Sequence, residues 1–340
     1  MKVIVTAAAG DLGQAVIKAL RLGTGSYCII GTDIQESMIA RHTSDEFHLI
    51  PPASEKQQYI KTLEELAETV GAMAVIPCSE IEIGTLHSFG KYPRLESGAQ
   101  VICQSPEVVE LFGDKLKCYE FLNEHVDLAA FADGKDRVAV SNFIGRYGYP
   151  VFIKERFSSG SKGVKQINSE EELIQNQEAF DSPVIQDYLE GDDFEYSVGV
   201  FKKNNDVRVV SYRRYLGALG CSWKAELDMN QQVVDYSKSI SNVISFEGGI
   251  NIQLRLTSSG PRLLEINTRF SSLCAARAAC GFNDVEWSLL NLGRDCLPAM
   301  HALPSSFKFE RYIGEVVSIN DETSTSLEEL IIHNSQQNRG

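Results

Sequence analysis

The sequence predicts an α/β protein whose C-terminal part is α+β. Over about the first 105 residues, short apolar segments alternate with segments of helical periodicity, which is typical of a parallel sheet covered on both faces. A glycine-containing turn directly follows the first apolar segment. Beyond residue 150, strand-like segments follow one another with fewer helical segments between them, which predicts a second, strand-rich region.

The N-terminal elements follow in the order expected of a Rossmann-like domain. Residues 11–22 place their apolar side chains on one side of a helix, and residues 59–70 form a second helical segment. Strands are expected at 2–6, 27–33, 73–77 and 100–103. We assign residues 1–110 to this domain.

The remaining chain predicts strands that pair around polar turns, with helices between some of them. Helices are expected at 114–124, 169–178, 229–244 and 284–293. Strands are expected at 150–154, 164–167, 183–188, 195–201, 207–215, 250–256 and 262–266. After Asp321 the chain becomes polar, and we expect a loosely packed tail with a short helix at 326–333.

Composition excludes several classes of protein. The chain has 340 residues, 43% hydrophobic and 23% charged, and a net charge of −14, which argues against a nucleic-acid partner. The start lacks the pattern of a signal peptide, and no apolar stretch reaches the length of a membrane span. The eight cysteines include no Cys-x-x-Cys pair, so we expect reduced thiols in a cytoplasmic protein with no membrane partner.

The N-terminal glycines allow one alternative function. Residues 8–13 (AAGDLG) approximate a dinucleotide-binding turn with alanine at the first glycine position, and Asp33 ends the second strand where such folds hold a ribose. The same glycines also suit simple packing of the first helix against the sheet. No Tyr-x-x-x-Lys pair of a short-chain dehydrogenase occurs in the chain. An NAD(P)-dependent oxidoreductase therefore remains an alternative hypothesis.

Residues 264–272 (LEINTRFSS) form the segment most indicative of chemistry. Because side chains alternate along a strand, Glu265, Asn267 and Arg269 are expected on one face. A carboxylate and an amide oxygen are hard ligands suited to Mg²⁺ that also holds phosphates. Arg269 would then face a transferring phosphoryl group or an anionic substrate.

A second polar face lies on the strand just upstream. It carries Asn251, Gln253 and Arg255 at alternate positions. If the two strands are adjacent and antiparallel, Gln253 lies beside Glu265, which would complete a set of oxygen ligands. The competing interpretation is a pair of edge strands with solvated polar faces.

Basic and glycine-rich segments upstream fit a nucleotide phosphate. Lys154 ends an apolar strand, and the loop 157–164 (FSSGSKGV) supplies glycines and serines whose N–H and O–H groups can approach phosphate oxygens. Residues 184–191 leave an apolar strand as a hinge that can hold adenine, and Glu195 follows as a carboxylate for ribose hydroxyls. Lys115, at a helix start, is either a second phosphate contact or a surface lysine.

These motifs, in this order, resemble the ATP-grasp superfamily, and most closely the ATP-binding half-domains of the carbamoyl-phosphate synthetase large chain. The similarity covers about residues 1–318 and is most specific in GINIQLRL and LLEINTRFSS. The resemblance implies a pre-ATP-grasp domain followed by a two-subdomain ATP-grasp fold. The implied divisions are the Rossmann-like domain at 1–110, a small lid subdomain at 111–190, a large subdomain with the metal site at 191–320, and the polar tail at 321–340.

The resemblance also assigns roles to individual residues. The metal ligands would be Gln253, Glu265 and Asn267, for Mg²⁺ or alternatively Mn²⁺. The nucleotide contacts would be Lys115, Lys154, Ser159, Gly160, Ser161, Gly163, Gln186, Asp187, Tyr188, Leu189 and Glu195. Lys154 and Arg269 would also be catalytic. Gln253 stands where many members have an acid, and the segment before Glu195 is longer than in some relatives, so Asp193 is an alternative ribose contact.

The implied activity is ATP-dependent ligation of a carboxylate to an amine through an acyl phosphate. The chain has one ATP-grasp unit, which argues against carbamoyl phosphate synthesis itself. Arg213, Arg214, Tyr215 and residues 217–224 are expected to border a pocket for an anionic acceptor, although a solvated strand end is the alternative for the two arginines. Non-catalytic nucleotide binding and kinase-like phosphorylation remain alternatives. A homodimer is common in the superfamily.

Overall fold

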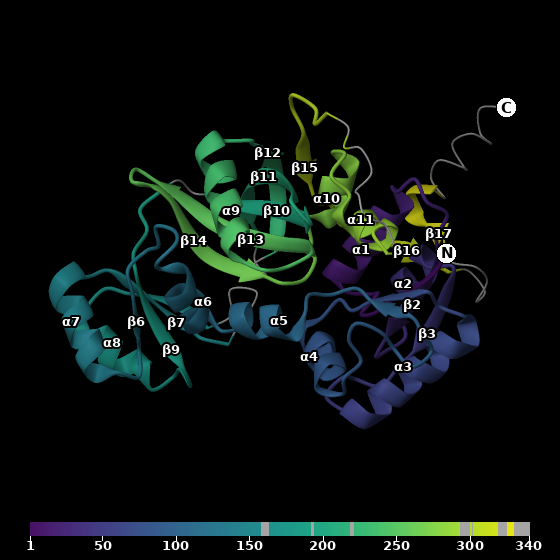
Figure 1. The fold of residues 1–340 in the computed structure, drawn as a ribbon, viewed down its shortest axis with the longest axis horizontal. Coiled ribbons are helices and arrows are strands. Elements are labelled where there is room, and N and C mark those ends of the chain that lie inside the picture. The colour runs from purple at the N-terminus through teal and green to yellow at the C-terminus, as the bar shows by residue number, and fades with distance from the viewer. Residues whose placement is uncertain are drawn as a thin grey trace. The chain divides into compact units, whose positions relative to one another are not determined.

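The computed structural model describes residues 1–157, 163–191, 194–217, 221–292, 300, 302–318 and 325–329. The chain forms two compact units (Figure 1). The first contains the described parts of residues 1–105, 269–304 and 310–340, and the second those of 106–268 and 305–309.

A parallel sheet with strand order β3-β2-β1-β4-β5 forms the centre of the first unit. Its strands are β1 (Lys2–Val5), β2 (Cys28–Asp33), β3 (Glu46–Leu49), β4 (Ala74–Ile76) and β5 (Gln100–Val101). Side chains alternate between its faces, so Val3 and Val5 join one apolar cluster and Ile4 joins another. The predicted parallel sheet, covered on both faces, is confirmed.

Helices from two distant parts of the chain cover this sheet. They are α1 (Asp11–Arg21), α2 (Met38–Thr43), α3 (Lys56–Val70), α4 (Glu80–Ser88), α10 (Cys274–Ala279) and α11 (Asp284–Leu290). Phe270, Cys274, Val285 and Leu289 share the apolar cluster of α1. Residues 269–292 are therefore packed as part of the first unit. The short strands β16 (Val316–Val317) and β17 (Thr325–Ser326) pair antiparallel in the same unit.

The glycine turn before α1 is used for packing. A Cβ at Gly13 would lie 2.2 Å from the carbonyl oxygen of Ala7, so only glycine lets the helix approach the strand end this closely. Asp33 accepts the Ala9 N–H at 2.9 Å and the Ile34 N–H at 2.8 Å. Both carboxylate oxygens of Asp33 are thus engaged with backbone, which favours the packing interpretation of this turn.

The second unit contains two sheets. The smaller has strand order β6-β9-β7-β8 and consists of β6 (Phe131–Asp133), β7 (Val151–Glu155), β8 (Val164–Ile167) and β9 (Pro183–Asp187). The helices α7 (Arg137–Tyr147) and α8 (Glu170–Gln177) pack on it around Val140, Phe143 and Leu173 (Figure 1).

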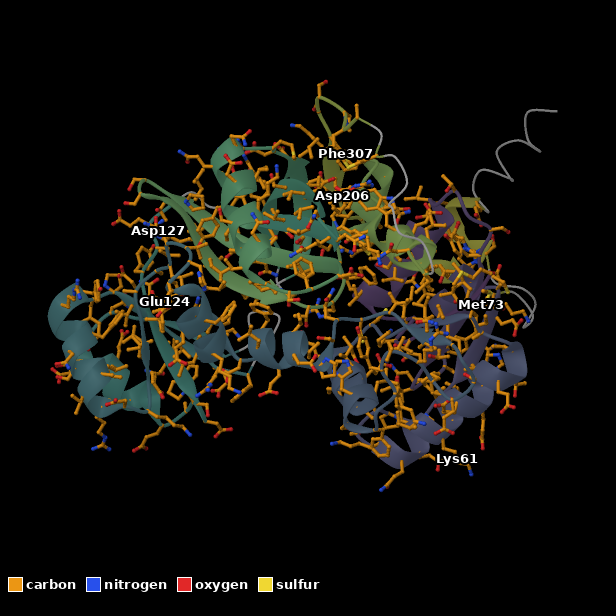
Figure 2. All side chains as sticks on the ribbon, in the orientation of Figure 1. Lys61, Met73, Glu124, Asp127, Asp206 and Phe307 are labelled. Atoms are coloured by element: carbon orange, nitrogen blue, oxygen red, sulfur yellow. The ribbon has the colours of Figure 1, made fainter. Side chains whose placement is uncertain are left out.

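The larger sheet has the strand order β14-β13-β10-β11-β12-β15. Its strands are β10 (Glu195–Lys203), β11 (Asp206–Leu216), β12 (Ser222–Leu227), β13 (Gly248–Thr257), β14 (Gly260–Asn267) and β15 (Lys308–Glu310). The helices α5 (Pro106–Gly113), α6 (Lys115–Leu122) and α9 (Gln231–Val243) share its apolar core. The Leu227 N–H donates to the carbonyl of Phe307, labelled in Figure 2, and so attaches residues 305–309 to this unit.

Each strand predicted from the sequence is present, with ends that differ by at most two residues. The helices predicted at 11–22, 59–70, 114–124, 169–178, 229–244 and 284–293 are also found. The sequence patterns missed α2, β3, α4, α5, β6, α7, β12, α10 and the strands β15 to β17. Of the helix predicted at 326–333, residues 330–333 lie outside the described residues.

Candidate functional site

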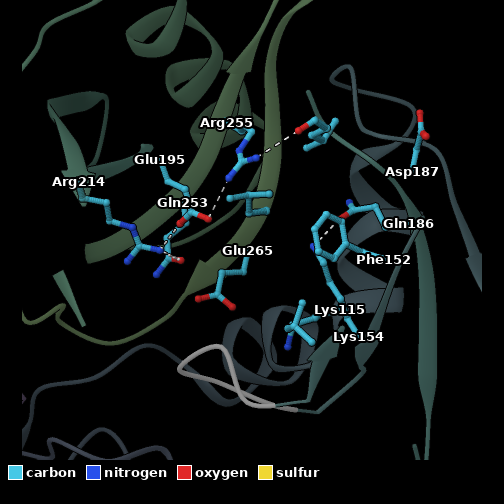
Figure 3. A pocket seen from close by; sticks show the side chains of 13 residues that line it. Lys115, Phe152, Lys154, Gln186, Asp187, Glu195, Arg214, Gln253, Arg255 and Glu265 are labelled. Atoms are coloured by element: carbon cyan, nitrogen blue, oxygen red, sulfur yellow. Dashed lines mark hydrogen bonds and ion pairs between the residues drawn. The ribbon is translucent and has the colours of Figure 1, made fainter. Parts of the chain in front are cut away.

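A pocket lies within the second unit, between the smaller sheet and the larger one (Figure 3). Side chains reach it from β7 and β9 on one side, from β10, β11, β13 and β14 on the other, and from the start of α6. Its lining residues are Lys115, Phe152, Lys154, Val164, Gln186, Asp187, Leu189, Glu195, Arg214, Gln253, Arg255, Leu264 and Glu265. The pocket thus collects most of the described residues predicted to bind a nucleotide.

Lys154 is buried in the wall formed by β7 and β9. Its Nζ donates a hydrogen bond to Oε1 of Gln186 on the neighbouring strand, as Figure 3 shows. Burial lowers the pKa of the Lys154 ammonium to about 8. Lys115 also opposes its charge, and Glu265 favours it. A buried cation facing a pocket is well suited to bind an anion.

Lys115 enters the pocket from the first turn of α6. Asp114 caps this helix by accepting the N–H groups of Leu116 and Lys117, and it pairs with Arg156 at 2.6 Å. Lys115 is only 8% exposed and lines the pocket, so it is not a surface lysine. Two lysines from different elements therefore supply positive charge to one site.

The predicted pairing of the two polar strand faces is confirmed. In the antiparallel register of β13 and β14, Gln253 lies opposite Glu265 and Asn251 lies opposite Asn267. The Asn267 amide donates to Oε1 of Glu265 at 3.0 Å. Asn251 is fully buried and accepts from Ser197 at 2.9 Å. The polar faces of these strands are thus partly buried against the pocket rather than solvated edges.

Glu195 lies between two arginines in the wall of the larger sheet. Arg214 Nη2 donates to it at 2.7 Å, and Arg255 Nη2 lies 3.8 Å from its other oxygen (Figure 3). Arg255 also donates to the carbonyl oxygen of Leu189 at 3.2 Å. Arg255 therefore contacts both Glu195, the predicted ribose contact, and Leu189 in the predicted adenine hinge.

The side chains of Arg213 and Arg214, which are consecutive on β11, point to opposite faces of the sheet. Arg214 lines the pocket, whereas Arg213 pairs with Asp228 at 2.5 Å and lies over the ring of Phe194 at 5.2 Å. Tyr196 donates to the same carboxylate. The expectation that both arginines border one acceptor pocket is therefore wrong for Arg213, because adjacent strand residues point to opposite faces.

The residues predicted to bind a metal fit Mg²⁺ by the chemistry of their donors. Glu265 offers a carboxylate, and Gln253 and Asn267 offer amide oxygens, all of them hard ligands. Among the residues that the structure describes, no group of three His, Cys, Asp or Glu side chains could hold a metal ion. A metal at this site would therefore use one carboxylate, two amides and oxygens from its ligand or from water.

Other predicted residues lie beside the pocket or away from it. The Tyr188 ring stacks on Phe152 with the ring centroids 5.7 Å apart, and Gly163, directly before β8, has a φ of 65°. Arg269 follows the end of β14, belongs to the first unit and pairs with Glu80 at 3.1 Å. Ser159, Gly160, Ser161 and Asp193 lie outside the described residues.

Phe152 and Arg255 line the pocket, although the sequence patterns assigned neither of them a role. Phe152 shares a strand face with Lys154, and Arg255 shares one with Gln253. The two-residue spacing in a strand could have identified both, since each stands two positions from a predicted site residue. Phe152 supplies an apolar surface next to the hinge, and Arg255 supplies a second cation beside Glu195.

Comparisons with known proteins agree with this architecture. A family model described as "ATP-grasp in the biosynthetic pathway with Ter operon" matches residues 179–307. The chain is 24% identical over 259 residues to a formate-dependent phosphoribosylglycinamide formyltransferase of Prochlorococcus marinus, a match that covers 72% of this chain and 62% of that protein. The chain thus spans less than two thirds of the length of this relative.

A second curated relative is the arginine-specific carbamoyl phosphate synthase large chain of Halalkalibacterium halodurans, which is 20% identical over 75% of this chain and 25% of its own length. Among solved structures, N5-carboxyaminoimidazole synthetase from Staphylococcus aureus, complexed with ADP, aligns with a TM-score of 0.72 at 17% identity. The alignment covers 92% of this chain and 82% of that one. The fold is therefore shared. No helix in the described part of the chain could span a bilayer.

Proposed function

This chain belongs to the ATP-grasp superfamily, and from that premise we propose that it is an ATP-dependent carboxylate–amine ligase. The observation that carries the proposal is the pocket of the second unit. Lys115 and Lys154 bring positive charge to it, the segment Gln186–Leu189 and Glu195 border it, and Gln253 and Glu265 face it. The proposed substrates are a small carboxylate and a small amine, and the proposed setting is the cytoplasm.

Each wall of the pocket has a part in the proposed mechanism. The Gln186–Leu189 segment holds adenine, Glu195 accepts the ribose hydroxyls, and Lys115 and Lys154 neutralise the phosphates. Gln253, Glu265 and Asn267 would hold Mg²⁺, which supplies charge neutralisation for the transferring phosphoryl group. The positions of these residues on strands and a helix start keep the groups in place, which is most of what phosphoryl transfer requires of a protein.

The proposed reaction has two balanced steps. An oxygen of the substrate carboxylate attacks the γ-phosphorus, the bond from that phosphorus to the bridging oxygen breaks, and ADP leaves. The amine nitrogen then attacks the acyl carbon, the bond from that carbon to the phosphate oxygen breaks, and the nitrogen releases a proton. No side chain of the protein has to act as a covalent nucleophile.

The proposal is tested by ADP release from Mg·ATP. Candidate carboxylates and amines, including amino acids, dipeptides and acidic sugars, are screened in pairs and singly. Release that requires both members of a pair supports a ligase. Release with one member alone would indicate a kinase-like reaction, and absence of ATP binding would contradict the central proposal. Lys154→Met is the matched variant that shows whether release depends on this pocket.

The same lysine predicts how nucleotide affinity depends on pH. In the empty pocket Lys154 loses its proton as pH rises through about 8, and nucleotide phosphates favour the charged form. Above that pH, binding has to take up a proton, so ADP affinity should fall by up to about tenfold per pH unit, whereas below it this lysine adds no pH dependence.

The measurement is the Kd of ADP by calorimetry, in EDTA, from about pH 7 to about pH 9.5. Lys115 and Arg255 oppose the positive charge on Lys154, and Glu265 and Glu195 favour it. Lys154→Met should bind ADP more weakly and without this slope. A flat wild-type profile over the same range would contradict the assignment of Lys154 as a phosphate contact.

A further inference from the structure

Arg214 connects two groups of the pocket that belong to different strands. Its Nη2 donates to Oε2 of Glu195 at 2.7 Å and to Oε1 of Gln253 at 2.5 Å (Figure 3). Glu195 stands opposite Arg214 on the neighbouring strand β10, and Gln253 lies one strand further, on β13. One guanidinium therefore reaches across β10 and fixes two side chains of the pocket wall.

The environment of Arg214 makes this link strong. Arg214 is only 8% exposed, and Glu195 is largely buried beside it. Charge-assisted hydrogen bonds of this kind are stronger than neutral ones, and removing one partner leaves the other buried group unsatisfied. Arg255, at 3.8 Å, is a second cation next to Glu195, so the carboxylate keeps a positive neighbour when Arg214 is replaced.

Arg214 contacts the two groups that the proposed mechanism assigns to different parts of the ligand. Glu195 would accept the ribose hydroxyls, and Gln253 would hold the metal that also contacts the phosphates. Without Arg214, the Gln253 amide oxygen would lose this donor, and the Glu195 carboxylate would keep only the more distant Arg255 as a cation, so both side chains could adopt other rotamers more easily. The orientation of both depends on the same Nη2 group.

We propose that Arg214 is a positioning residue that orients Glu195 toward the ribose and Gln253 toward the metal, so that both contributions to nucleotide binding depend on it. The proposal rests on the proposed function, because it requires that ATP and Mg²⁺ occupy this pocket. It concerns selectivity within the site and assigns Arg214 no contact with the reacting atoms.

The test compares the Kd of ATP with that of 2′,3′-dideoxy-ATP, which lacks both ribose hydroxyls, and the Kd of ATP with and without Mg²⁺. Wild-type protein should prefer ATP by about tenfold, since the lost hydrogen bonds involve a charged acceptor. In Arg214→Met that preference should fall to about twofold or less, and the Mg²⁺ enhancement should fall with it. A merely structural loss would weaken both nucleotides equally and leave the ratio unchanged.

Two further variants keep the result interpretable. Arg214→Lys retains the charge and should recover part of both effects. Arg208→Gln, on the same strand and paired with Asp206 at 3.0 Å, should keep the wild-type ratios. An unchanged ATP preference or an unchanged Mg²⁺ enhancement in folded Arg214→Met overturns the proposal.

Nucleotide binding by the wild-type protein distinguishes this proposal from the ligase proposal on which it rests. Wild-type protein that binds ATP but shows no preference over the dideoxy analogue contradicts the role of Arg214 and leaves the ligase proposal standing. Wild-type protein that binds neither nucleotide removes both.

Discussion

Glu265→Gln is expected to lower ATP turnover by about a thousandfold while leaving the fold intact. The substitution keeps the shape of the side chain and removes the one carboxylate among the three proposed metal ligands. A metal acting as a Lewis acid on a phosphoryl oxygen contributes several kcal/mol, and about 4 kcal/mol corresponds to about three orders of magnitude in rate. The measurement is kcat for ADP release at saturating Mg·ATP, with circular dichroism and the thermal midpoint as checks of folding.

The same variant gives a second, independent result. Glu265 favours the charged form of Lys154, so its neutralisation should lower the pKa of Lys154 further and move the pH profile of ADP affinity to lower pH. Asp206→Asn, at the start of β11 and half exposed, removes a carboxylate away from the pocket and should change neither quantity. Wild-type turnover in Glu265→Gln, or in Asn267→Ala, would contradict the metal assignment.

Alternation of side chains along strands was enough to predict which strand residues lie together in the pocket. Polar residues at every second position of two strands led to the expectation that Gln253 lies beside Glu265, and the observed register pairs them. Lys154, one residue before the end of β7, was expected near a phosphate because an apolar strand leads to it, and the structure places it in the lining of the pocket with Gln186. Local periodicity was sufficient in both cases, since the face of a strand residue follows from its position.

Partners across the sheet could not be read from the same patterns. Arg213 and Arg214 are identical in type and adjacent in sequence, yet one pairs with Asp228 and the other with Glu195 and Gln253. Which face meets the pocket depends on how β11 is placed beside β10, which is a tertiary property. The elements that the sequence patterns did not predict are mostly short, such as β6 with three residues, or lack a strong apolar side, such as α4.

The packing of residues 269–292 in the first unit could also not be predicted from the local sequence. Phe270 and Cys274 look like ordinary apolar positions, and their packing with α1 depends on a long-range contact. A linear division of the chain into consecutive domains cannot represent such a return. The structural reason is that α10 and α11 complete the cover of one face of the parallel sheet beside α1.

A buried ion pair holds this returning segment together. Arg277 on α10 and Asp284 at the start of α11 lie 2.6 Å apart, and both side chains are 1% exposed. Arg277 also donates to Ser271 at 3.0 Å. Removing one partner of such a pair leaves an uncompensated buried charge, so Asp284→Ala should lower the free energy of unfolding of the first unit by about 3–5 kcal/mol.

Trp287 lies in α11 and is buried, so its fluorescence reports on unfolding of this unit once the chain's other tryptophan is replaced by Trp223→Phe. Urea unfolding in that background should show a clearly lower midpoint for Asp284→Ala. Glu65→Ala, which removes an exposed partner of Lys61 (labelled in Figure 2), should change the free energy of unfolding by less than about 0.5 kcal/mol.

The double variant Arg277→Met with Asp284→Leu separates the two causes of instability. It removes both charges and fills the space with apolar side chains, so most of the lost stability should return if the single variant is unstable because the buried Arg277 guanidinium has lost the Asp284 carboxylate. If the double variant is as unstable as Asp284→Ala, the loss comes from packing or from the start of α11 instead. A midpoint for Asp284→Ala equal to that of the parent would show that the ion pair does not hold α10 and α11 in place.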